Sequence, residues 1–199
     1  MNKYSYFYKM IEKTEYRLNQ IFTATLNLTG KVGIAGLKMS DIAKEAKIAS
    51  GTLYIYFKSK EELLNALYYK LQRESAPAIV DTISHLPINI QLYKMWHIAL
   101  KRLVEDNMRI IFLEQFLISP LISDTNKNLD IKFKNYLKEL LDKGKKENLI
   151  KDIDSQMLIS LIIGFIRTYS TYLVNEKESI LTDDLVDKSF ALCWQAIEK

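Results

Sequence analysis

Residues 40–57 read SDIAKEAKIASGTLYIYF, and their pattern predicts two short helices joined by a turn. In the first half, Ile42, Ala43 and Ala46 recur at i, i+1 and i+4, which places them on one narrow apolar stripe of a helix of about two turns. The alanine side chains are small, so a second helix can approach closely. We expect Ile48, in the turn, to fill the angle between the two helices.

The second helix of this stretch is predicted to present its polar end to the outside. Leu53 and Phe57 stand four residues apart and are expected to point inward. The side chains left outside are then Ser50, Thr52, Tyr54, Ile55 and Tyr56. We expect the Ser50 hydroxyl to cap the helix by accepting from a free N–H of its first turn. A helix end with small, hydroxyl and tyrosine side chains suits the DNA major groove, and the pair indicates a helix-turn-helix. The alternative is a helical hairpin that packs against the rest of the protein and does not bind DNA.

Residues 41–64 closely resemble the N-terminal DNA-binding domain of the TetR/AcrR transcriptional regulators. The motifs of that family occur here in the family's order, as Ile42-Ala43, Ala46-Lys47-Ile48-Ala49, Gly51-Thr52-Leu53-Tyr54, Tyr56-Phe57 and Ser59-Lys60-Glu61-Glu62-Leu63. The resemblance covers roughly residues 12–72 and implies an all-α protein of two parts. We expect a three-helix helix-turn-helix DNA-binding domain at residues 1–58 and a helical ligand-binding and dimerisation domain at residues 59–199.

The resemblance also implies which residues touch DNA. Tyr54, Tyr56 and Lys60 match phosphate or base contacts of the family, and Ile55 either meets a thymine methyl group or is simply an exposed apolar residue. The full set of expected DNA-contacting residues is Lys38, Ser40, Ser50, Gly51, Thr52, Tyr54, Ile55, Tyr56 and Lys60.

Three positions depart from the family pattern. Lys47 replaces the usual glycine of the turn, so the turn either accepts strain of about 1 kcal/mol or takes another shape. Ala49 replaces a common capping serine. Lys38 stands where a serine or threonine usually caps the first helix of the pair, and it either reaches a phosphate itself or leaves the cap to Ser40.

The rest of the chain reads as helices. Glycine and proline are scarce among the 199 residues, with six and three, which argues against long loops and sheet turns. The first helix is expected over residues 13–30, and Gly30, Gly33 and Gly36 are expected to end it and open a loop. Ser59 and Glu62 are spaced as a capping box, each expected to bond the amide of the other. Further helix starts are expected at caps formed by Asp154 and Ser155 before residues 156–174 and by Thr182 before residues 183–197.

Charge divides the chain unevenly. Residues 1–75 carry a net charge of +5 and residues 76–199 a net charge of −1. A basic N-terminal third beside a nearly neutral remainder fits a DNA-binding part joined to a ligand-binding and dimerising part.

Several classes of function find no support. Cys193 is the single cysteine, which excludes an internal disulfide framework and is expected to be a buried, inert thiol. His85 and His97 lack metal-ligand spacing, and no nucleophile or nucleotide-binding motif occurs. The N-terminus lacks an apolar secretory segment, and the longest apolar stretch, residues 157–166, is shorter than a membrane span. We expect a cytoplasmic protein that is not an enzyme, with no cofactor, metal or membrane partner.

Residues of the C-terminal part are candidates for a ligand pocket and a dimer interface. Glu114 stands in an apolar run, and we expect it to be buried with Arg167, a tyrosine or a cationic ligand as its partner. Pocket candidates, each also compatible with an ordinary core, are Trp96, His97, Phe112, Glu114, Phe116, Phe165 and Tyr169. Because residues 157–166 are apolar on all faces, and the family dimerises through its last two long helices, the expected interface residues are Ile163, Gly164, Phe190 and Trp194.

Together these features predict a transcriptional regulator, a repressor, that binds a palindromic operator in double-stranded DNA as a homodimer. A small apolar or amphipathic ligand would release it. Two alternatives stay open: a regulator that needs no ligand, and a helical binding module that has lost DNA recognition.

Overall fold

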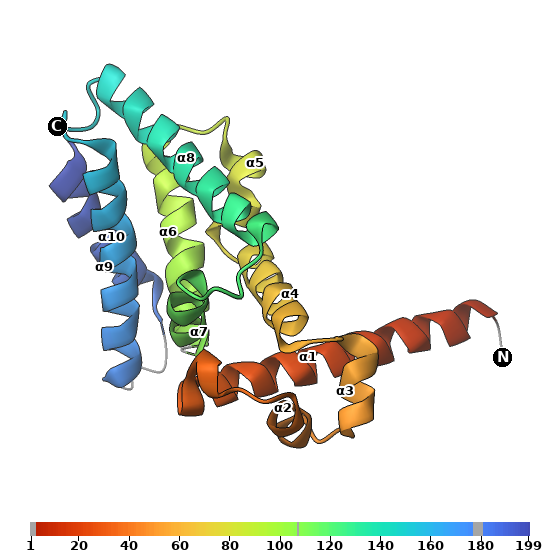
Figure 1. The fold of residues 1–199 in the computed structure, drawn as a ribbon. Helices are drawn as coiled ribbons and strands as arrows, with labels where there is room; N and C mark the ends of the chain where they lie inside the picture. Colours follow the sequence, from red (N-terminus) through yellow and green to blue (C-terminus); the bar gives the residue numbers. More distant parts are fainter. Residues whose placement is uncertain (1–2, 107, 177–180) are drawn as a thin grey trace. The chain divides into compact units, whose positions relative to one another are not determined.

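The computed structural model describes residues 3–106, 108–176 and 181–199, and within them the regular elements are helices (Figure 1). The predicted all-α class is confirmed. In chain order the elements are α1 (Lys3–Gly36), α2 (Met39–Glu45), α3 (Ser50–Tyr56), α4 (Lys60–Arg73), the 3₁₀ helix η1 (Ala76–Ile79), α5 (Val80–Ile83), α6 (Ile88–Glu105), α7 (Met108–Leu117), α8 (Asp124–Lys146), α9 (Ser155–Asn175) and α10 (Asp183–Ile197).

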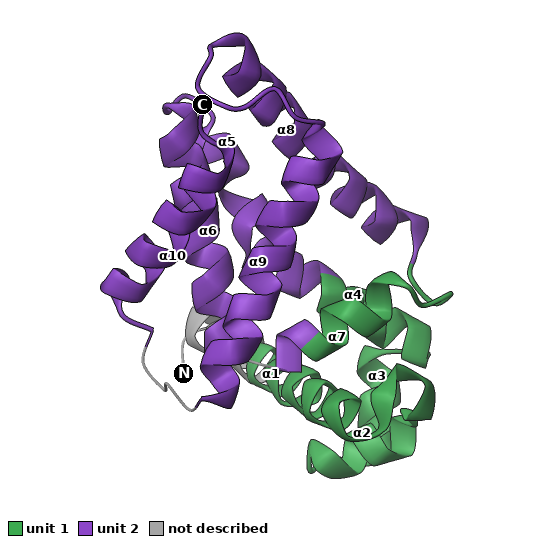
Figure 2. Ribbon diagram, turned by 90° about the vertical axis from the view of Figure 1, so that its left-hand side faces the viewer, with its two compact units in different colours: residues 1–68, 111–122 green, residues 69–110, 123–199 purple. Residues whose placement is uncertain are grey.

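Packing divides these helices into two compact units (Figure 2). Unit 1 holds residues 1–68 and 111–122, and unit 2 holds residues 69–110 and 123–199. The chain therefore passes from one unit to the other inside α4 and again inside α7. The division after residue 58 stays a prediction. Leu63, Leu64 and Leu67 at the start of α4, each 0% exposed, belong to unit 1.

Unit 1 is built on the buried face of α1. Ile21 is 0% exposed, and Phe22 packs on Phe57 with ring centroids 5.8 Å apart. Thr25 and Thr29 are also buried, and each hydroxyl donates to the carbonyl four residues earlier, at 2.8 Å. Such bonds allow hydroxyl side chains inside a core without an unpaired donor.

The first helix is longer than predicted and is broken near its end. It spans Lys3–Gly36 instead of residues 13–30, and Gly33 interrupts it with φ of 67° and ψ of 167°. This left-handed φ costs glycine little, because glycine has no Cβ to clash with the backbone. Of the three glycines expected to end the helix, Gly33 marks the break, whereas the helix continues through Gly30 and as far as Gly36.

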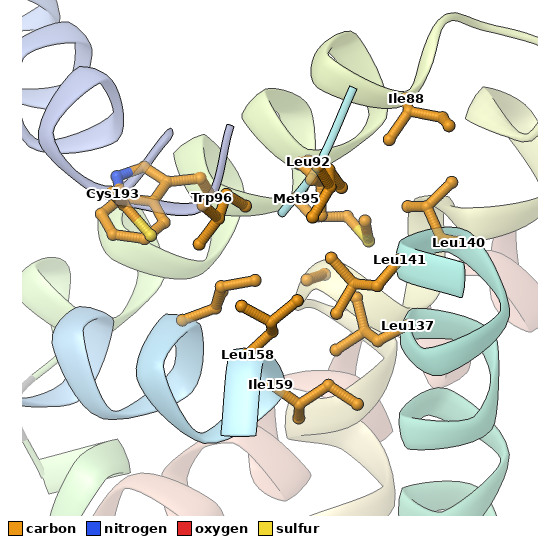
Figure 3. Packing of buried hydrophobic residues seen from close by; sticks show 14 of the residues in the cluster. Ile88, Leu92, Met95, Trp96, Leu137, Leu140, Leu141, Leu158, Ile159 and Cys193 are labelled. Carbon is orange, nitrogen blue, oxygen red and sulfur yellow. The ribbon is translucent and has the colours of Figure 1, made fainter. Parts of the chain in front are cut away.

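Unit 2 has a core shared by α6, α8, α9 and α10. Figure 3 shows side chains of α6, among them Met95, facing Leu141 of α8 and Leu158 of α9. Cys193 of α10 is buried, as expected, and burial raises the pKa of its thiol to about 11. The end of α10 is hydrogen-bonded to the segment between α8 and α9, since the Lys151 N–H donates to the Ile197 carbonyl at 2.8 Å.

Two predicted caps are confirmed in unit 2. The Asp154 carboxylate accepts from the Met157 N–H at 3.0 Å at the start of α9, and the Thr182 hydroxyl accepts from the Leu185 N–H at 3.3 Å at the start of α10. The short helices η1 and α5 were not predicted, because four residues are too few to show a helical period.

Candidate nucleic-acid interface

The turn between α2 and α3 closes through two backbone hydrogen bonds. The Ile48 N–H donates to the Ala43 carbonyl at 2.9 Å, and the Lys47 N–H donates to the Lys44 carbonyl at 3.0 Å. This pair of bonds is the Schellman pattern at a helix C-terminus. Lys47 has a φ of 55°, which costs a non-glycine residue about 1–2 kcal/mol. With lysine in place of the usual glycine, the turn therefore keeps its shape and accepts the backbone strain, which is the first of the two predicted alternatives.

Helix α3 buries one face and exposes the other. Leu53 is 0% exposed and Phe57 is 5% exposed, so their predicted inward orientation is confirmed. On the opposite face Tyr54 is 52% exposed and Ile55 is 82% exposed. Of the other expected contact residues on this helix, Ser50 and Gly51 are exposed, and Thr52 and Tyr56 are half-buried. An apolar side chain as exposed as Ile55 lacks the burial that normally stabilises it in a monomer.

Helices α2 and α3 both begin without a side-chain cap. Ala49 is the N-cap residue of α3 and Ser50 lies inside the helix, so the predicted cap by Ser50 is wrong. Lys38 is the N-cap residue of α2 and makes no capping bond through its side chain. The expected substitute, Ser40, is one residue inside the helix, and its hydroxyl donates to Asp41 Oδ1 at 3.4 Å instead.

Lys60 has acceptors for its ammonium group within unit 1. Its Nζ donates to the carbonyls of Leu37 at 3.1 Å, Ile34 at 3.3 Å and Ala35 at 3.5 Å. A lysine ammonium has three donors, and here three carbonyls face it. The expected phosphate contact by Lys60 stays a prediction, and a phosphate would have to share or displace these carbonyls.

The capping box at the start of α4 forms with one change. The Ser59 hydroxyl accepts from the Glu62 N–H at 3.1 Å, as predicted. The Glu62 carboxylate accepts from the Lys58 N–H at 2.7 Å, so the predicted return bond to the Ser59 amide is wrong by one residue.

The predicted ligand-contacting residues fall in different units. Phe112 and Phe116 are 0% exposed and belong to the part of α7 that packs in unit 1. Glu114 belongs to the same part but is exposed, so the expectation of a buried carboxylate is wrong. It stands two residues from each phenylalanine, about 200° around the helix, and therefore lies on the opposite side. Arg167, its expected partner, belongs to unit 2.

The remaining pocket candidates meet in unit 2 around Trp96. Its ring lies 5.4 Å from Phe165, and Phe165 lies 5.7 Å from Tyr169, measured between centroids. The Trp96 indole N–H donates to the Ser189 hydroxyl at 3.0 Å, a buried partner that the sequence did not single out. His97 lies further out, with Nε2 3.8 Å from Asp183 Oδ1.

The predicted interface residues differ in exposure. Gly164 is exposed, and a Cβ at this position would meet nothing within 4 Å. Ile163 and Trp194 are half-buried, and Phe190 packs against Trp96 with centroids 6.0 Å apart. Residues that the prediction missed extend the exposed apolar surface of α9 and α10: Met157 at 66%, Leu161 at 42%, Tyr172 at 54% and Leu192 at 62%. The spacing of Met157, Leu161 and Gly164 places them on one face, a signal that the sequence already contained.

Helix α9 is, among the described residues, the one helix whose length and apolar composition would suffice to cross a membrane. Helices in the core of a soluble protein meet the same two criteria. In α9 one set of apolar side chains is buried and another is exposed: Leu158 and Ile159 lie in the core of unit 2, and Met157 and Leu161 are exposed.

An outward-facing second helix, a tight turn and a separate helical unit define a helix-turn-helix DNA-binding regulator. The chain belongs to the tetR family of bacterial regulatory proteins. The family's N-terminal region matches residues 21–67, and the region described as "Tetracyclin repressor-like, C-terminal domain" matches residues 72–199. The protein is therefore a DNA-binding transcriptional regulator and not an enzyme.

Individual relatives agree with this assignment. An uncharacterised helix-turn-helix regulator of Haemophilus influenzae is 28% identical over 90% of this chain and 95% of its own. The fatty acid metabolism regulator protein of Bacillus subtilis is 27% identical over 80% and 84%.

Solved structures share the fold. A TetR-family regulator from Marinobacter aquaeolei has a TM-score of 0.78 at 23% identity, over 94% of this chain and 98% of its own. FadR from Bacillus subtilis, in complex with stearoyl-CoA, has a TM-score of 0.68 at 21% identity, over 89% and 98%.

Proposed function

We propose that this regulator represses transcription by binding a palindromic operator as a homodimer and that an amphipathic ligand with a long apolar part releases it. The observation that carries the operator-binding part is the outward face of α3, with Tyr54 and Ile55 exposed above a buried Leu53. We assign the operator contacts to this face and to the start of α2. In this proposal the protein acts in the cytoplasm, where bacterial DNA lies.

The dimer part of the proposal rests on the exposed apolar face of α9 and α10. Contiguous apolar surface on a soluble protein marks an interaction site, and a face that includes Met157, Leu161 and Leu192 fits a second copy of the same face. In this proposal each subunit of the dimer contributes one α3 to the same duplex. Half-sites are then expected about one helical turn, ~34–36 Å, or a multiple of it apart.

The ligand part rests on the aromatic side chains in unit 2 and on the relatives. Phe165 packs against both Trp96 and Tyr169, and apolar and aromatic side chains with few polar groups are typical of ligand sites. A fatty acid metabolism regulator among the relatives, and a similar fold that holds stearoyl-CoA, favour an acyl-CoA as this chain's ligand.

A binding titration tests the operator-binding part. Fluorescence anisotropy on DNA from upstream of the protein's own gene, after footprinting, gives the Kd of the wild type and of Tyr54→Ala. We expect the variant to bind about 10- to 100-fold more weakly, because one hydrogen bond lost at each of two half-sites costs about 1–3 kcal/mol in total. Tyr69→Ala is the matched control, because Tyr69 is 44% exposed and lies outside α3. Equal affinity of Tyr54→Ala and wild type would refute the assignment of this face.

A second titration tests the ligand part by itself. Stearoyl-CoA, shorter acyl-CoAs, free fatty acid and coenzyme A are added to the preformed protein–DNA complex and, separately, to the free protein. We expect the long acyl-CoA to release the DNA and raise the Tm of the free protein, since a ligand of the folded state stabilises it, whereas coenzyme A should do neither. If none of these compounds acts while the operator still binds, the ligand proposal fails and the operator proposal stands.

A further inference from the structure

The backbone of residues 34–37, which we call the link, runs from the break in α1 at Gly33 towards the start of α2. A side chain of α7 holds it. The break at Gly33 removes the Ile34 N–H from the regular bonding of α1, and Gln115 Oε1 accepts from this N–H at 2.9 Å. A Cβ at Gly33 would lie 3.3 Å from the same oxygen. Glycine at position 33 therefore permits both the backbone break and the close approach of Gln115.

The carbonyl groups of the same link are held from α4. Lys60 donates to the carbonyls of Ile34, Ala35 and Leu37. The link therefore offers its first N–H to α7 and three carbonyls to α4. Leu37 at its end is 3% exposed, and α2 begins two residues later. The link therefore leads directly into the α2–α3 pair.

The second half of α7 is firmly part of unit 1. Phe116 lies 5.7 Å from Tyr68 and 5.3 Å from Phe112, measured between ring centroids. Beyond the helix end, the Asn65 side-chain amide donates to the Leu121 carbonyl at 2.8 Å. Gln115 lies between these contacts, so its position is fixed by the packing of α7.

The first turn of α7 is held in unit 2, at the end of α4. Arg109 Nη2 lies 2.5 Å from Glu74 Oε2, and Arg102 Nε donates to the Glu74 carbonyl at 3.1 Å. Burial alone would raise the pKa of Glu74, but hydrogen bonds from Lys70 and Arg109 outweigh it and hold the pKa below its ordinary value. Helices α4 and α7 thus start and end in different units, and each carries a side chain that holds the link.

We propose that Gln115 is a positioning residue for operator binding, because its oxygen fixes the link and through it the α2–α3 pair. This inference rests on the operator-binding function proposed above.

Three variants test the proposal. Gln115→Met keeps the length of the side chain and removes the acceptor, Gln115→Glu keeps an acceptor oxygen, and Gln20→Met is the matched control. Gln20 belongs to the same unit, and its side chain accepts from Arg17 at 3.1 Å and donates to Tyr16 at 3.2 Å, both on its own helix. The measurements are hydrogen exchange of the Ile34 amide and the operator Kd at 0.15 M salt, where distant charges are screened.

We expect Gln115→Met to speed exchange at Ile34 and to raise the operator Kd about 3- to 10-fold, the range that one lost hydrogen bond gives. Gln115→Glu should restore both quantities, and Gln20→Met should change neither. A folded Gln115→Met protein that exchanges faster but binds with wild-type affinity would overturn the proposal. If Gln115→Met does not fold, Gln115→Glu alone decides. A folded Gln115→Glu protein with wild-type exchange and affinity supports the proposal, and a folded Gln115→Glu protein that binds the operator weakly overturns it. A wild type that binds no upstream DNA would instead refute the proposed function.

Discussion

Lys60 can act on DNA, on the link, or on both, and the salt dependence of binding separates these roles. A lysine that neutralises a phosphate releases counterions, so its removal lowers the slope of log K against log salt by about 0.9 per contact. Because three carbonyls already face the ammonium group, we expect Lys60→Met to weaken operator binding several-fold with an unchanged slope.

The control for this measurement is Lys101→Met, which replaces an exposed lysine of α6 in unit 2. It should change neither affinity nor slope. A slope that falls by about two per dimer in Lys60→Met would show that Lys60 binds a phosphate at each half-site. The hydrogen bonds from Lys60 to the link carbonyls would then not account for its effect on operator binding.

Gly51 separates stability from recognition. A Cβ at this position meets no atom within 4 Å, and alanine is favoured over glycine inside a helix by about 0.5–1 kcal/mol. We expect Gly51→Ala to raise the Tm slightly and to weaken operator binding about tenfold or more, because the added methyl group would stand between the helix end and the DNA backbone. Calorimetry and anisotropy measure the two effects. Unchanged affinity would mean that this end of α3 does not approach DNA closely.

At the scale of the element, the junction of α8 and α9 is held by one carboxylate. Asp142 Oδ2 lies 2.7 Å from Lys138 Nζ, and Asp142 Oδ1 accepts from the Ser155 hydroxyl at 2.5 Å. Lys145 Nζ lies 2.8 Å from the same Oδ1. Hydrogen bonds from Lys138, Lys145 and Ser155, in that order of size, hold the pKa of Asp142 well below its ordinary value.

Stability should therefore depend on the charge of Asp142. A carboxyl whose folded pKa lies below its unfolded pKa stabilises the fold above the unfolded value, about 3.9 for Asp, and this contribution is lost as pH falls below it. We expect Asp142→Asn to lower the free energy of unfolding by about 1–2 kcal/mol at pH 7, with a smaller difference at pH 3. Urea unfolding at both pH values and one protein concentration measures this, and an equal difference at both would exclude the charge as the cause.

Local signals in the sequence were sufficient for most elements. Periodicity and capping preferences act between neighbours within a few residues. They were sufficient to predict the inward Leu53 and Phe57, the caps at Asp154 and Thr182, and Gly33 as a helix-breaking residue of α1. Ser50 shows the limit of such signals, since a shift of one residue turns an N-cap into the first residue of the helix.

Contacts between distant residues could not be predicted in the same way. Helix α7 is apolar nearly all round. Its packing decides the exposure of Glu114, the burial of Phe112 and Phe116 in unit 1, and the hydrogen bond from Ile34 to Gln115. Such a helix carries no amphipathic signal that tells which side faces which neighbour.

At the scale of the whole molecule, the exposed apolar face of α9 should set the oligomeric state. Leu161 lies in this face and is 42% exposed, and a charge buried there on dimerisation would lack a partner. We expect Leu161→Glu to weaken the dimer about 100-fold or more and to lower operator affinity with it. Light scattering and sedimentation as a function of concentration measure the effect.

Ile131→Glu is the matched control for the dimer prediction. Ile131 is 52% exposed but belongs to α8, so the same substitution there should leave the dimer intact. Should Leu161→Glu remain dimeric at the wild-type concentration, another surface would have to join the two copies.

The buried thiol of Cys193 makes the molecule convenient for spectroscopy. It is the single cysteine of the chain, it is 4% exposed, and its raised pKa of about 11 leaves on the order of one thiolate in ten thousand at neutral pH. Thiol-reactive dyes would therefore spare it and modify only a cysteine introduced on the surface, for example in Lys44→Cys on α2. One such label per subunit would turn the span between the two helix-turn-helix pairs into an interdye distance that can be followed as ligand is added.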